Sequence, residues 1–146
     1  METFWAALSP QLYPISQLLL ASVLGAVIGW QRETHGKAAG ARTCALVTGG
    51  AALFTILSAA FPAEPSHVAA QIVVGIGFLG AGLIIQREDR IVGLTTAASL
   101  WFAAAIGMAV GFGFFLLAII AAALTLLILT INEEKLVKPN GNEPRT

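Results

Sequence analysis

The residues of this chain that could do chemistry lie in short polar segments between long apolar runs. Arg32 and Glu33 close the first run, Arg42 and Thr43 open the second, and the charged segment 87–90 separates the third from the fourth. Mixed charges in such places are typical of a network of ion pairs at the level of the lipid headgroups, with arginine as a multiple donor. The alternative is that these charges only anchor the helix ends in water.

No charged residue lies inside the apolar runs, and this limits the chemistry that the chain can perform. Proton relays and cation pathways normally use intramembrane ionisable groups, and magnesium prefers hard oxygen ligands such as carboxylates. Glu33 is the deepest acidic candidate. A phosphate-binding loop, a paired Cys or His metal spacing and a nucleophile with a base are all missing. The sequence therefore predicts no enzyme and no cofactor, and leaves a metal site unassigned.

The polar groups within the runs are one amide and several hydroxyls. They include Gln71, Thr48, Thr55, Ser58, Thr95, Thr96 and Ser99. Hydroxyls in membrane helices often donate to the carbonyl four residues earlier, so we expect most of them to be structural. We expect Gln71 to bond to backbone or to a neighbouring helix, and Cys44 to be a small packing residue.

Four charge-free apolar runs must position these residues, at 15–30, 43–61, 68–85 and 93–131. Hydrophobic residues make up 57% of the 146 and charged residues only 11%, whereas soluble domains carry roughly 25% charged residues. Lipid must therefore surround most of the surface. The last run, as one helix, would be about 58 Å long, nearly twice the ~30 Å hydrocarbon core. We expect it to fold back at the segment 111–113, which predicts an all-α membrane protein with five transmembrane helices.

The orientation of these helices follows from the basic residues. All eight fall in the segments 31–42, 86–92 and 132–146, which share one side of the membrane when there are five spans. The positive-inside rule then places the N-terminus in the periplasm and the C-terminus in the cytoplasm of a bacterial inner membrane. Four spans would put the basic tail outside. The net charge of zero argues against a nucleic-acid partner.

The chain divides into a periplasmic lead-in at 1–14, a transmembrane domain at 15–131 and a flexible cytoplasmic tail at 132–146. The lead-in is either a short interfacial helix or disordered. It lacks the basic start of a cleaved signal peptide, so we expect it to be retained.

Small residues four apart mark helix faces on which two backbones can approach closely. Gly25 and Gly29 lie on such a face of the first helix, and Gly107 and Gly111 on one of the fourth. These faces pack either inside one bundle or against a second copy in a homodimer.

The third helix carries four glycines within eight residues, at Gly75, Gly77, Gly80 and Gly82. Each costs about 1 kcal/mol of helix propensity relative to alanine, which suggests contacts with neighbours on several sides. We therefore place this helix at the centre of the bundle. The alternative is that the helix breaks here and its free backbone groups bind an ion at mid-membrane.

Several segments together carry a family resemblance. IGWQRE at 28–33 is followed by AGART at 39–43, by AQIV and GIGFLGAG at 70–82, and by GLTTAASLW at 93–101. In this order and at these intervals they resemble the MgtC/SapB family of bacterial inner-membrane proteins. The resemblance implies a link to growth at low magnesium and, in pathogens, to survival inside macrophages. It also implies a regulator of other membrane machines, including ATP synthase and transporters.

Two features depart from the family pattern. Family members usually carry an acidic residue at the position of Gln31, so a role that rests on a carboxylate there is not carried over, although Glu33 could replace it from another helix face. Longer members also carry a C-terminal soluble domain. This chain stops about 15 residues after its last apolar run, so we expect a short form without that domain.

We therefore predict a membrane protein that supports growth at low magnesium, and virulence in a pathogen, by binding and regulating other membrane proteins. The residues assigned to its functional polar cluster are Arg32, Glu33, Arg42, Thr43, Gln71, Thr95, Thr96 and the packing anchor Trp101. The runner-up is a small homodimeric transporter or channel for magnesium or another ion, with its pathway at the third helix. A water-filled cavity lined by backbone carbonyls near 75–82 would favour it, and a dry, tightly packed helix would not. A purely structural scaffold is a third class, which the sequence does not separate from the regulator.

Overall fold

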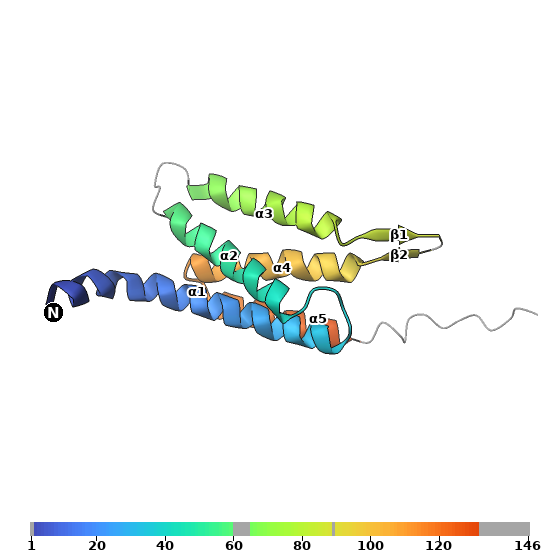
Figure 1. Cartoon of the computed structure of the whole chain (residues 1–146), viewed down its shortest axis with the longest axis horizontal. Helices are drawn as coiled ribbons and strands as arrows, with labels where there is room; N and C mark the ends of the chain where they lie inside the picture. The colour runs from blue at the N-terminus through green and yellow to red at the C-terminus, as the bar shows by residue number, and fades with distance from the viewer. Residues whose placement is uncertain (1, 60–64, 89, 132–146) are drawn as a thin grey trace, which may run out of the picture.

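The computed structural model describes residues 2–59, 65–88 and 90–131, and their side chains except those of 2–9 and 65–66. Five helices run through this part of the chain, as Figure 1 shows. They are α1 (Glu2–Thr34), α2 (Ala41–Ala59), α3 (Pro65–Ala81), α4 (Leu94–Gly111) and α5 (Phe115–Thr130). Three of them, α1 from Pro10, α2 and α4, are long and apolar enough to cross a membrane. The predicted helical fold with five helices is confirmed, whereas the five membrane spans and their orientation stay predictions.

Helix α1 begins at Glu2, well before the first span was expected to start. Its 33 residues correspond to about 50 Å, which exceeds the ~30 Å hydrocarbon core. Figure 1 shows its N-terminal part extending beyond the other helices. The interfacial placement of 1–14 stays a prediction, and the predicted tail at 132–146 lies outside the described residues.

Helix α4 forms the centre of the bundle, because it contacts all four other helices. Its side chains Ile106 and Val110 lie in the main buried cluster with Ile28 of α1, Ala52 of α2 and Ala118 of α5. Helix α3 packs against α2 and α4 at the edge of the bundle, and Figure 1 shows it on the outside. The prediction that the glycine-rich third helix is central is therefore wrong.

The predicted fold-back in the last apolar run is confirmed. Helix α4 ends at Gly111, and α5 begins at Phe115. Gly113 adopts a φ of +83°, a left-handed conformation that glycine reaches without steric cost. The N–H groups of Gly113 and Phe114 donate to the carbonyls of Val110 and Ala109, which satisfies two carbonyls that a helix end leaves without partners.

The connection between α3 and α4 contains a β-hairpin that the sequence did not predict. Helix α3 ends at Ala81, before residue 85 where the third apolar run stops. Strands β1 (Ile85–Arg87) and β2 (Arg90–Val92) then pair antiparallel. Gly93, at φ +95°, ends the hairpin, and a Cβ at this position would overlap the carbonyl of Leu83. Glycine at position 93 therefore lets the chain pass close to Leu83 between β2 and α4.

Candidate functional site

A buried polar contact joins the C-terminal end of α1 to the start of α4. Arg32, in the last turn of α1, is 3% exposed, and its Nη2 donates to Oγ1 of Thr96 at 2.6 Å. Thr96 is also buried, two residues after α4 begins. A buried charge is tolerated only where hydrogen bonds replace its lost hydration. The contact therefore fixes the end of α1 against the start of α4.

Glu33 joins α1 to the start of α2. Its Oε2 accepts a hydrogen bond from the backbone N–H of Ala41, the first residue of α2, at 3.1 Å. A carboxylate is favourable there because the first N–H groups of a helix have no partner within it and carry a partial positive charge. Close packing accompanies this contact, since a Cβ at Gly29 would lie 2.6 Å from the Cα of Ala41.

Gln31 joins α1 to the end of α5. Its Nε2 donates to the backbone carbonyl of Leu129 at 3.2 Å. A carboxylate at this position would have no N–H to donate and would repel that carbonyl, so the amide of Gln31 makes a contact that an acidic residue could not make.

Residues 31–33 thus reach three different helices. Consecutive helical residues point about 100° apart, so one short segment can face α5, α4 and α2 in turn. We call Gln31, Arg32 and Glu33 the α1 tether.

The other residues of the predicted cluster lie at the surface of the described chain. Arg42, Thr43, Gln71 and Thr95 are exposed, and Trp101 is 48% exposed on α4, so Trp101 is no buried packing anchor. Of the eight predicted residues, Arg32 bonds to Thr96, and Glu33 bonds to the start of α2. The functional role of these exposed residues stays a prediction.

A second tether, which sequence reasoning did not assign, lies half-way along α1. Gln17 is 3% exposed, and its Nε2 donates to the carbonyls of Val110 and Gly111 at 2.7 and 3.0 Å. It thereby satisfies carbonyls at the end of α4, next to the turn into α5. The sequence did contain a signal for this contact. Gln17 lies four residues before Ala21 and eight before Gly25, and therefore on the same helix face as these small residues.

The small-residue faces of α1 and α4 both pack against α2 within this chain. Gly25 of α1 and Gly107 of α4 both approach Thr48 of α2, which is fully buried between them. Gly111 lies in the same way against Thr55. Of the two readings left open by the sequence, packing inside one bundle accounts for these glycines.

Three buried hydroxyls in α2 and α5 bond to their own helices. Thr48 donates to the carbonyl of Cys44 at 2.8 Å, Thr55 to that of Ala51 at 2.7 Å and Thr125 to that of Ala121 at 2.7 Å. Within residues 2–59, 65–88 and 90–131, no three His, Cys, Asp or Glu side chains lie close enough together to hold a metal ion.

The glycines of α3 have a different environment from those of α1 and α4. A Cβ at Gly75 or Gly77 would meet nothing within 4 Å, whereas one at Gly80 would rest on Ala97 at 3.6 Å. The helix continues unbroken from Pro65 to Ala81, just before Gly82. The alternative of a helix break is therefore wrong for Gly75–Gly80.

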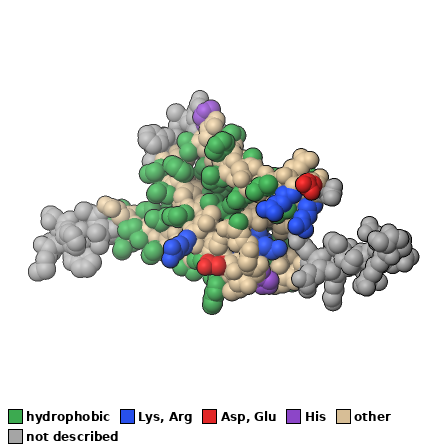
Figure 2. Space-filling view, turned by 45° about the vertical axis from the view of Figure 1, so that its right-hand side comes forward, with side chains coloured by type: hydrophobic (Ala, Val, Ile, Leu, Met, Phe, Trp, Pro, Cys, Tyr) green, Lys and Arg blue, Asp and Glu red, His purple; other side chains and the backbone are tan. Residues whose placement is uncertain are grey.

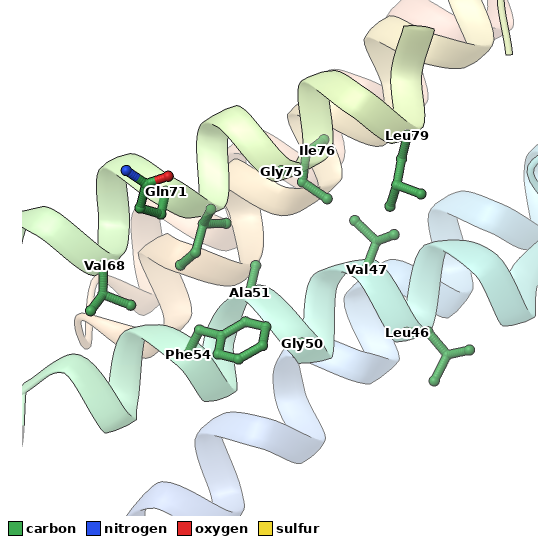
Figure 3. Close-up of a pocket in the computed structure, with 11 residues that line it drawn as sticks. Leu46, Val47, Gly50, Ala51, Phe54, Val68, Gln71, Gly75, Ile76 and Leu79 are labelled. Carbon is green, nitrogen blue, oxygen red and sulfur yellow. The ribbon is translucent and has the colours of Figure 1, made fainter. Parts of the chain in front are cut away.

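An apolar groove of about 620 Å³ lies between α2 and α3. Figure 3 shows Val47 and Ala51 on α2 pointing toward α3, with Val47 and Leu79 pointing toward one another, and Leu46 and Phe54 of α2 also line the groove. The residues that complete its wall are Gly50, Val68, Gln71, Ile72, Gly75 and Ile76. Side chains of apolar residues, with the single amide of Gln71, make up most of this wall, in contrast to the carbonyl-lined cavity that the runner-up function requires.

Comparison with known proteins identifies the family. The model of the MgtC family matches residues 18–136, which is most of the chain. This chain belongs to the MgtC family. Among MgtC-family relatives, YhiD of Escherichia coli (strain K12), named as a candidate magnesium transporter, is 45% identical over 127 residues, covering 80% of this chain and 59% of YhiD. Protein MgtC of Salmonella typhimurium (strain LT2) is 48% identical over 119 residues, covering 81% of this chain and 50% of that protein.

The MgtC-family match includes the α1 tether, Thr96 and the whole α2–α3 groove. The chain spans between half and three-fifths of the length of these curated relatives. No solved structure matches it.

Proposed function

We propose that this chain is a multi-pass protein of the bacterial inner membrane that supports growth at low magnesium by binding and regulating other membrane proteins. Its membership of the MgtC family, and a relative named for magnesium transport, support the link to magnesium. The regulatory role, and ATP synthase or a transporter as the partner, come from the family resemblance.

In the proposed topology all five helices cross the membrane, with the N-terminus in the periplasm. The end of α1, the hairpin and the end of α5 lie at one end of the bundle, and the α4–α5 turn lies at the other (Figure 1). Arg32, Lys37, Arg42, Arg87 and Arg90 belong to the first of these ends. The positive-inside rule favours that end as cytoplasmic.

The observation that carries the proposed role is the position of Thr48 between Gly25 and Gly107. Gly25 of α1 lies against the side chain of Thr48 and Gly107 of α4 against its backbone, so three helices are closely packed in the middle of the bundle. The charged side chain that is buried among the described residues is Arg32, a cation near the cytoplasmic end. A fixed positive charge opposes the entry of a magnesium ion. These features favour a protein that acts through contacts rather than through turnover.

The α2–α3 groove provides a face for such a contact. Gly50 and Gly75 line it, and neither has a neighbour within 4 Å of its Cβ position. Small residues let a second transmembrane helix approach closely, where dispersion and hydrogen bonds stabilise association in lipid.

Two matched variants test this role. Gly75→Leu fills the groove, whereas Gly77→Leu adds the same side chain at a position that does not line it. Both positions are open, so both variants should insert and fold. In a strain without its own MgtC-family protein, we expect Gly75→Leu to lose support of growth at low magnesium and Gly77→Leu to keep it. Full support from Gly75→Leu, at equal protein levels, would contradict binding through the groove.

A further inference from the structure

The register of the hairpin places two like charges opposite each other. Arg87 pairs with Arg90, and Ile85 with Val92, so that all four side chains share one face of the hairpin. All four residues are exposed. Like charges directly opposite destabilise a strand pair unless something between them offsets the repulsion. Figure 2 shows Lys and Arg side chains gathered beside an acidic one on this side of the molecule.

The lengths of α3 and α4 determine how deep the hairpin lies. Helix α3 has 17 residues and α4 has 18, which correspond to about 25 and 27 Å, short of a ~30 Å hydrocarbon core. The chain next to both helices is apolar and exposed: Ile84, Ile85, Ile91 and Val92 are 40–56% exposed. These side chains would complete the apolar thickness that the two helices lack.

The arginines then reach the headgroup layer. Arg87 lies two residues beyond Ile85, which is about 7 Å along a strand. An apolar base with arginines one step further out matches the order of hydrocarbon and phosphate in a bilayer. Glu88 is exposed next to them, and Asp89 follows in the sequence, so the formal charge of segment 87–90 is zero. Direct contacts, rather than long-range attraction, must therefore supply the binding.

We infer that the β1–β2 hairpin is a lipid-binding element, in which Arg87 and Arg90 hold the phosphate of a phospholipid headgroup in the cytoplasmic leaflet. A phosphate between the guanidinium groups offsets their repulsion and offers bidentate acceptors. The inference rests on the membrane-spanning arrangement proposed above and not on the regulatory role.

Binding by the full chain in detergent micelles tests the phosphate contact. Native mass spectrometry would compare dioctanoyl phosphatidic acid with dioctanoylglycerol, which has the same acyl chains without the phosphate, and with inorganic phosphate. We expect the phosphatidic acid to bind best, and to bind about fivefold more weakly for each of Arg87→Gln and Arg90→Gln. Lys37→Gln, an exposed basic residue of another loop, should bind like the wild type.

Three outcomes would overturn the inference. Wild-type affinity in the double variant would remove the arginines from the site. Equal binding of dioctanoylglycerol would mean that acyl chains alone are bound, and equal binding of inorganic phosphate would indicate a free-anion site instead of a lipid site.

The depth of the hairpin is measured separately. Single cysteines at Ile85 and at Glu88, in a Cys44→Ala background, would carry a spin label in liposomes of phosphatidylethanolamine and phosphatidylglycerol. We expect the label at 85 to collide more with oxygen, which partitions into lipid, and the label at 88 more with a water-soluble nickel chelate. Equal exposure of both labels to the chelate would place the hairpin in bulk water and contradict the inference.

Discussion

Nη2 of Arg32 donates a hydrogen bond to Oγ1 of Thr96 at 2.6 Å, and both side chains are buried at the junction of α1 and α4. With Gln31 bonded to α5 and Glu33 to α2, this contact makes the end of α1 the point where three other helices are positioned. The segment 31–33 thus has a structural role in this chain that its charges alone do not reveal.

Loss of the Arg32–Thr96 contact should destabilise the bundle. A hydrogen bond to a charged group contributes about 1.5–3 kcal/mol, so we expect that loss of unfolding free energy in Arg32→Gln and in Thr96→Val. Thr96→Ser keeps the hydroxyl and should stay near the wild type, as should Arg42→Gln at an exposed position. Thermal unfolding in detergent, followed by helical circular dichroism, measures these differences. An equal loss in Arg42→Gln would contradict the special role of Arg32.

The same glycine-to-alanine substitution should have different effects on stability at two positions. Gly107→Ala places a methyl group onto the backbone of Thr48, whereas Gly75→Ala places it in open space. We expect Gly107→Ala to lose about 1–3 kcal/mol, as overpacked cores do. Gly75→Ala should be neutral or slightly stabilising, because alanine favours helix. The same unfolding assay decides, and equal effects at both positions would argue against the α1–α2–α4 packing.

Replacing the amide of Gln17 should destabilise the end of α4 and the turn that follows it. In Gln17→Glu the amide N–H groups that bond to Val110 and Gly111 are replaced by a carboxylate, which repels both carbonyls. We expect a lower unfolding temperature and faster amide exchange around the α4–α5 turn. Gln86→Glu makes the same change at an exposed strand position and serves as the control. Unchanged exchange in Gln17→Glu would show that this contact does not hold the turn.

The proposed topology predicts which added cysteines a membrane-impermeant maleimide reaches in intact spheroplasts. In a Cys44→Ala background, His67→Cys should be labelled from outside, and Lys37→Cys only after the membrane is opened. Native Cys44 is fully buried and should react only after unfolding. Labelling of Lys37→Cys in intact spheroplasts would reverse the orientation.

The helices themselves could be predicted because lipid imposes a strong rule, namely long apolar runs bounded by charges. The turn at 111–113 followed from length, since one helix could not fit the core. The hairpin was missed because three-residue strands leave almost no signal. The β-branched residues of Ile85–Arg87 and Arg90–Val92, on either side of two acidic residues, were the weak cue to a hairpin.

The position of α3 could not be predicted from its glycines. A glycine permits a close approach without specifying the neighbour, and Gly75 and Gly77 face open space. Similarly, the charges of segment 31–42 predicted a polar cluster but not its connections. Which helix each of Gln31, Arg32 and Glu33 faces depends on how the bundle is assembled, and no local pattern encodes that.

Ion flux tests the central claim, a membrane protein without turnover of its own, most directly. The purified full chain would be reconstituted in liposomes that contain a magnesium-sensitive dye, with an ionophore to confirm that the dye responds and Gly75→Leu as a variant. We expect magnesium entry no faster than in protein-free liposomes, for the wild type and the variant alike. Saturable entry that scales with the amount of wild-type protein and is lost in Gly75→Leu would contradict the proposed role and establish a transporter with its pathway at the α2–α3 groove.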